Sequence, residues 1–70
     1  MRYLIIIEET ETGFSAYLPD LPGCVSTGES EDAVVANMRE AIEFHIDGLK
    51  ADDLPVPAPA SRSSWVEVAA

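Results

Sequence analysis

Cys24 and His45 are the two side chains whose types suit nucleophilic or metal chemistry, and each is the single residue of its kind. A nucleophilic cysteine needs a base that lowers its pKa, and a metal site needs several ligands at short spacing. No second cysteine or histidine supplies such a partner. We therefore interpret Cys24 as a small buried residue at a tight turn and His45 as a residue at the edge of the core. We expect no cofactor and no metal.

Carboxylates are the abundant functional group of the chain. Thirteen Asp and Glu residues stand against four Lys and Arg, which gives a formal net charge of −9. Such a surface repels the phosphates of nucleic acids and attracts basic partners. Glu8, Glu9 and Glu11 belong to the first predicted hairpin, and Glu29 precedes the predicted helix, at what we expect to be the same end of the fold. We take these four residues as candidates for binding a basic protein; the alternative is ordinary solubility charge.

Length and composition predict one small domain, residues 1–70, that associates with itself. A chain of 70 residues buries only roughly 60% of its unfolded surface, so a single core gives marginal stability. The longest apolar run, Tyr3–Ile7, is too short for a membrane span or a signal-peptide core. A lone cysteine suits a reducing compartment, so we expect a cytoplasmic protein.

Four strands and one helix are expected, in the order β-β-β-α-β. Residues 3–7 of the first strand are all apolar, so both faces of this strand need cover. One helix can cover one face, and a second subunit or another protein must cover the other. The predicted bounds are 2–8, 14–18, 24–28 and 65–68 for the strands, about 31–50 for the helix and 51–64 for a proline-rich tether.

The helix is predicted by its cap and its apolar spacing. Ser30 is a good N-cap, and Glu31 and Asp32 suit the positive end of the helix dipole. Apolar positions recur every three to four residues and form one stripe that can face the sheet. The stripe consists of Val34, Met38, Ala41, Ile42, His45 and Leu49.

The expected fold class is α+β: a three-stranded antiparallel meander with one helix on one face and a C-terminal edge strand. The tether's alternating prolines exclude helix and central strand, and its fourteen residues span roughly 43 Å when extended. The tether either wraps over the surface or hands strand 65–68 to a neighbouring subunit. We expect a dimer or tetramer. The interface candidates are Leu4, Ile6, Tyr17, Trp65 and Val66.

Two segments carry a resemblance to a known family. The first is the apolar strand 2–8, and the second is Gly13–Cys24, which includes Pro19-Asp20-Leu21-Pro22-Gly23-Cys24 in a strand-turn-strand setting. Together with Gly28-Glu29-Ser30, the helix residues 37–42, the tether and Val66–Val68, they cover nearly the whole chain. In these features the chain resembles the short HicB-like antitoxins.

The resemblance implies a fold and a partner. The implied fold is a partial ribonuclease-H-like β-β-β-α-β domain. The implied partner is HicA, a small basic toxin that degrades mRNA and that the antitoxin blocks sterically. Many family members also carry a C-terminal DNA-binding module. No such module follows the predicted last strand here, so we do not expect direct DNA binding.

A ribonuclease H active site would need carboxylates that converge on divalent metal. Glu8, Glu40, Glu43 and Glu67 are the acids nearest to the required elements, but the middle of the first strand has none. We therefore expect a non-enzymatic protein: an antitoxin domain that neutralises a toxin. A stand-alone structural or regulatory oligomer without a toxin is the alternative.

Overall fold

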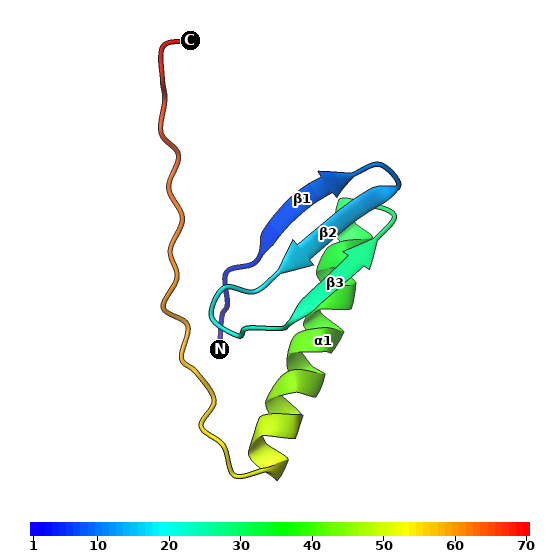
Figure 1. Ribbon diagram of the computed structural model, residues 1–70, viewed down its shortest axis with the longest axis vertical. Helices are drawn as coiled ribbons and strands as arrows, with labels where there is room; N and C mark the ends of the chain where they lie inside the picture. Colours follow the sequence, from blue (N-terminus) through cyan, green and yellow to red (C-terminus); the bar gives the residue numbers. More distant parts are fainter.

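Three antiparallel strands and one helix make up the computed structural model, which describes residues 1–70. Strand β1 spans Ile6–Thr10, β2 spans Gly13–Tyr17, β3 spans Val25–Gly28 and helix α1 spans Glu31–Ala51. The sheet order is β1-β2-β3, and α1 lies across one face of the sheet (Figure 1). The predicted α+β class, meander and single helix are confirmed.

The strand register places the core side chains on the face that α1 covers. Ile7 pairs with Ala16, and Ala16 pairs with Ser26 across the sheet. Ala16 and Leu18 are fully buried, and Tyr3, Ile5, Ile7 and Phe14 pack against the same core. Because alternate side chains point to opposite faces, Leu4 and Ile6 lie on the outer face, as the sequence predicted.

The connection from β2 to β3 is a double turn that contributes to the core. The N–H of Leu21 donates to the carbonyl oxygen of Leu18, and the N–H of Cys24 donates to the carbonyl oxygen of Leu21. Pro22 and Gly23 occupy the middle of the second turn, where Gly23 has a φ of 85°. This is the arrangement expected of a type II turn. It turns Leu18, Leu21 and Cys24 inward, and all three are buried.

Both ends of α1 are capped by the local sequence. Ser30 accepts a hydrogen bond from the N–H of Ala33 at 3.0 Å, which confirms it as the N-cap. At the other end, Asp53 adopts a φ of 54°, and the N–H of Leu54 donates to the carbonyl oxygen of Leu49 at 2.9 Å. The N–H of Asp53 also donates to the carbonyl oxygen of Lys50 at 3.1 Å, and the two bonds form a Schellman motif, which satisfies helical carbonyls at this end. The helix therefore ends within one residue of its predicted limit.

The core is small. Six residues are buried, and they form one cluster between the sheet and the first half of α1. The second half of α1 extends beyond the end of the sheet (Figure 1). The cluster consists of Ala16, Leu18, Leu21, Cys24, Val34 and Met38.

Two strand predictions need correction. Residues 2–5 are extended but lie outside β1, because β2 ends at Tyr17, which pairs with Ile6, and offers the earlier residues no partner. Residues 65–68 form no strand within the chain. Their backbone has no neighbouring strand, and Trp65 is 99% exposed. The tether 51–64 is extended beyond the helix end, as predicted, and runs along the side of the molecule on which β1 lies (Figure 1).

Candidate protein-binding surfaces

The outer face of the sheet presents a row of apolar side chains to solvent. Ile6 of β1 is opposite Tyr17 of β2, which in turn is opposite Val25 of β3. Tyr17 is 42% exposed and Val25 is 65% exposed. Leu4 lies on the same face by alternation. Three of the five predicted interface residues, Leu4, Ile6 and Tyr17, therefore share one surface, which is suited to a protein contact.

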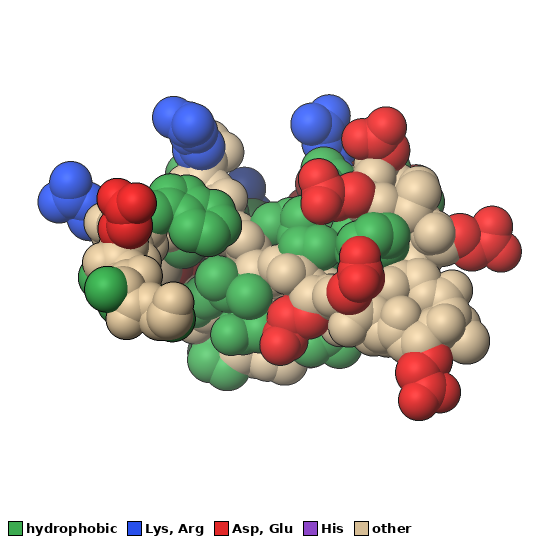
Figure 2. Space-filling view, turned by 90° about the horizontal axis from the view of Figure 1, so that it is seen from above, with side chains coloured by type: hydrophobic (Ala, Val, Ile, Leu, Met, Phe, Trp, Pro, Cys, Tyr) green, Lys and Arg blue, Asp and Glu red, His purple; other side chains and the backbone are tan.

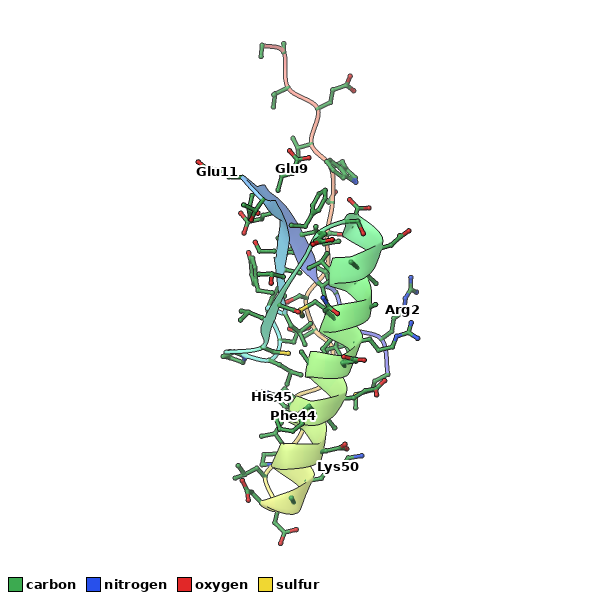
Figure 3. All side chains as sticks on the ribbon, turned by 90° about the vertical axis from the view of Figure 1, so that its right-hand side faces the viewer. Arg2, Glu9, Glu11, Phe44, His45 and Lys50 are labelled. Atoms are coloured by element: carbon green, nitrogen blue, oxygen red, sulfur yellow. The ribbon has the colours of Figure 1, made fainter.

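The predicted acidic candidates gather at one end of the sheet. Glu9 and Glu11 lie at the tip of the β1–β2 hairpin, far from Lys50 (Figure 3). A shallow depression beside this tip is lined by Thr10, Thr12 and Glu29 among others, so the hairpin and the start of α1 are neighbours. Glu8 projects from the adjoining outer face, opposite Ser15. We call this set, Glu8, Glu9, Glu11 and Glu29, the acidic end; its members are all exposed.

An apolar groove of about 760 Å³ lies between the N-terminal segment and α1. Tyr3, Ile5 and Ile7 form one wall, and Ile42 and Ile46 belong to the other. Three basic residues contribute to the groove lining, and two of them, Arg2 and Lys50, lie far from Glu9 and Glu11 (Figure 3). The three are Arg2, Arg39 and Lys50, three of the four Lys and Arg residues in the chain. Lys and Arg side chains gather along one edge of the molecule in Figure 2.

Asp20 fastens the tether to the β2–β3 turn. Its carboxylate accepts hydrogen bonds from the N–H of Ala60 at 3.0 Å and from the hydroxyl of Ser61 at 2.8 Å, and also from the N–H of Ser61. The hydroxyl of Tyr3 donates to the carbonyl oxygen of Pro57 a few residues earlier. Donors aimed at a carboxylate favour its charged form. The N–H groups of Ala60 and Ser61, followed by the Ser61 hydroxyl, accordingly hold the pKa of Asp20 below its ordinary value of 3.8.

The structure separates the remaining chemical candidates. Cys24 is buried, as predicted, and this burial raises the pKa of its thiol. His45 is half-buried on α1, beyond the end of the sheet (Figure 3). No group of three or more His, Cys, Asp or Glu side chains is placed to hold a metal ion. The four acids weighed for a ribonuclease H site, Glu8, Glu40, Glu43 and Glu67, are all exposed and do not converge.

Three residues that the structure singles out were not predicted from the sequence. Asp20 was placed in a turn, but its bond to residues forty positions later has no local signature. Val25 was treated only as part of a short strand, although alternation from buried Cys24 would have placed it outward. Phe44 is 81% exposed on α1 and lies off the predicted apolar stripe. A large aromatic residue on the polar side of a helix was the only sequence feature that could have drawn attention to it.

Comparison with known proteins identifies the family. A family profile described as a HicB-like antitoxin of a bacterial toxin-antitoxin system matches residues 3–69. The chain belongs to the HicB-like antitoxin family. Among solved structures, this HicB-like chain is similar to one in a HicA3 and HicB3 toxin-antitoxin complex. That match has 35% identity and a TM-score of 0.74, and covers 86% of this chain and 70% of the other.

Curated relatives of this HicB-like chain include proteins of phage and bacteria. An uncharacterized 14.9 kDa protein of Haemophilus phage HP1 is 42% identical over 57 residues, which are 81% of this chain and 43% of the relative. Antitoxin HicB 2 of Photorhabdus laumondii is 30% identical across 100% of this chain and 51% of its own length. A UPF0150 protein of Helicobacter pylori is 45% identical over 70% of this chain and 68% of its own. The chain thus spans about half of the phage protein and of HicB 2.

The structure contains no helix that could cross a membrane. The single helix of this HicB-like chain, α1, lacks the run of apolar residues that a bilayer span requires.

Proposed function

We propose that this chain is an antitoxin domain that binds a small basic toxin of the HicA type and blocks it sterically. The supporting observation is the match, at 35% identity and a TM-score of 0.74, to a chain from a HicA3 and HicB3 toxin-antitoxin complex. A net charge of −9 suits a basic partner. The action is stoichiometric binding without catalysis, carried out in the cytoplasm.

The acidic end is the proposed point of first contact. Its carboxylates belong to the β1–β2 hairpin and to Glu29 just before α1, and all four are exposed to solvent. Clustered charge of one sign raises the rate at which an oppositely charged protein associates, and added salt reduces that effect. The acidic end therefore steers the toxin, while apolar contacts beside it supply the lasting affinity.

Self-association is the second part of the proposal, as a dimer or tetramer. The accessible surface of the isolated chain is 5654 Å², whereas a folded monomer of 7.6 kDa is expected to expose roughly 4,300 Å². The excess is at least as large as the roughly 800 Å² that one partner contributes to an interface of standard size. An assembly of copies removes this surface from water.

Co-expression with the toxin tests the antitoxin function. The candidate toxin is any small basic protein encoded by a reading frame next to the chain's own gene; it is tagged for capture and assayed for mRNA cleavage. We expect the chain to co-purify with this toxin, to restore growth and to suppress cleavage in proportion to its amount. A chain that oligomerises but neither binds the toxin nor suppresses cleavage would instead be the stand-alone oligomer, and the proposal would be overturned.

A further inference from the structure

The groove beside α1 has the form of a site for a fourth strand, which the three-stranded sheet of this chain leaves unfilled. One wall is the helix-facing side of residues 3–7, and the other is the flank of α1 that carries Val35, Ile42 and Ile46. β1 is at the end of the strand order, so its backbone is unpaired on the side away from β2. An edge strand with free N–H and C=O groups beside an apolar groove is a place where a further strand can add.

The opposite edge of the sheet is less accessible. The side-chain amide of Asn37 on α1 donates to the carbonyl oxygen of Thr27 in β3 at 2.7 Å. This hydrogen bond occupies a backbone acceptor that an added strand would need. Of the two sheet edges, the β1 edge is therefore the better acceptor.

The chain carries a matching segment that its own fold leaves uncovered. Trp65, Val66 and Val68 are exposed, and Trp65 has almost no contact with the rest of the chain. The bonds from Asp20 to Ala60 and Ser61 fix the tether just before this segment. Beyond them the chain runs away from the sheet (Figure 1). An apolar extended segment held clear of its own domain is presented to another molecule.

Charge also matches the segment to the groove. The charged residues of the groove lining are the basic Arg2, Arg39 and Lys50 and one acid, Glu43, so the lining is basic on balance, and Glu67 is the single charged residue of the segment 65–68. An acidic strand is attracted to this part of the molecule, whereas the basic toxin is attracted to the acidic end. The two surfaces thus favour different partners.

We propose that residues Trp65–Val68 of one copy add as a fourth strand to the β1 edge of a second copy. Val66 and Val68, which share one face of an extended strand, fill the groove against α1. With the segment antiparallel to β1, Trp65 then lies on the outer face near Leu4 and Ile6, and Glu67 lies near Arg2. The exchange is reciprocal, so each copy of a dimer gives one segment and receives one. This inference rests on the self-association proposed above and supplies its contact.

Light scattering on the full-length chain tests the exchange. For the natural sequence we expect the mass of a dimer or of a multiple of a dimer. For the Val66→Asp, Val68→Asp double variant we expect at most half of that mass. A Ser63→Asp, Ser64→Asp variant is the matched control, because it adds the same charge just outside the segment and should keep the natural mass. A monomeric natural chain, or an assembly unchanged by Val66→Asp and Val68→Asp, would overturn the exchange.

Cross-linking between two differently tagged single variants shows which chain fills the groove. A Val66→Cys chain is mixed with an Ile42→Cys chain, both in a Cys24→Ala background, and oxidised. We expect a disulfide between the two tags, and much less of it when Thr27→Cys on β3 replaces Ile42→Cys. If a chain with both Val66→Cys and Ile42→Cys closes the disulfide within itself at monomer mass, the segment fills its own groove and the proposal is wrong.

The toxin experiment separates the two proposals. A chain that captures the toxin as a monomer would refute the exchange and leave the antitoxin function in place. A dimer that exchanges its segments but fails to capture the toxin would refute the antitoxin function and leave the exchange in place.

Discussion

At the scale of single residues, Asp20 links two parts of the chain that local sequence cannot relate. Its place between Pro19 and Leu21 predicts a turn, and the structure has that turn. Asp20 accepts hydrogen bonds from Ala60 and Ser61 because the tether passes beside it, and the path of the tether is set by where α1 ends. By contrast, the burial of Cys24 and the cap at Ser30 depend on nearby residues, and both could be predicted.

Replacing Asp20 should release the tether without unfolding the domain. In Asp20→Ala, three donor groups of residues 60 and 61 lose their acceptor while the buried core is untouched. We expect trypsin to cut after Arg62, next to the released segment, several times faster than in the natural chain. Asp47→Ala removes an exposed acid from α1 and is the control. Equal cutting in the natural chain and the Asp20 variant would mean that the Asp20 contact does not hold the tether.

Acid should release the same contact at a pH below the ordinary range for aspartate. The pKa of Asp20 is lowered in the folded chain, so its stabilising contribution is complete above the pKa of the unfolded chain. The contribution is lost as the pH falls through the lowered folded value. The amide resonances of Ala60 and Ser61, followed by NMR, should therefore titrate with a midpoint below 3.8. A midpoint at or above that value would contradict the assignment.

At the scale of elements, the predictions held where an element is stabilised from within. Helix α1 has its cap, its first-turn acids and its apolar stripe in one stretch, and its predicted end was within one residue. Strands depend on partners. Residues 2–5 and 65–68 have the composition of strands, but the single chain offers them no neighbour, so neither segment is paired. The sequence specified their tendency to form strands, and this chain's own fold supplies no strand to pair with them.

The junction of β3 and α1 depends on the absence of a side chain at Gly28. A Cβ added there would approach the backbone nitrogen of Val34 at 2.5 Å, and backbone cannot move aside as a flexible side chain can. We expect Gly28→Ala to lower the free energy of unfolding by about 1–3 kcal/mol, the usual cost of overpacking. Denaturant unfolding followed by circular dichroism measures this change.

Gly48 provides the matched substitution in the same molecule. It lies inside α1, and a Cβ added there meets no atom within 4 Å. Alanine is favoured over glycine in a helix by roughly 0.5–1 kcal/mol, so Gly48→Ala should stabilise the chain by that amount. If both glycine variants shift stability in the same direction, the close approach at Gly28 does not control this junction.

At the scale of the whole molecule, charge divides the surface into regions that suit different partners. The acidic end comprises hairpin residues and Glu29 just before α1, and three basic residues belong to the lining of the groove between the N-terminal segment and α1. Of these, Arg2 and Lys50 lie far from Glu9 and Glu11 (Figure 3). The excess of acid was plain from composition, and the meander predicted that Glu29 would join the hairpin acids. Arg39 and Lys50 share a flank of α1 because eleven residues are close to three helical turns. The position of Arg2 beside them could not be predicted, because it depends on how the N-terminal segment packs along α1.

Reversing charge at the acidic end should slow toxin capture more than the same reversal elsewhere. Glu9→Lys with Glu11→Lys and Glu40→Lys with Asp47→Lys change the net charge equally, but the second pair lies on α1 outside the acidic end. Since clustered charge acts mainly on association, we expect the first variant to lower the association rate with the toxin by about tenfold at low salt. Stopped-flow measurement should show this difference shrinking as salt is added, because screening removes long-range attraction. Equal slowing by both variants would show that the total charge, and not its position on the hairpin, attracts the toxin.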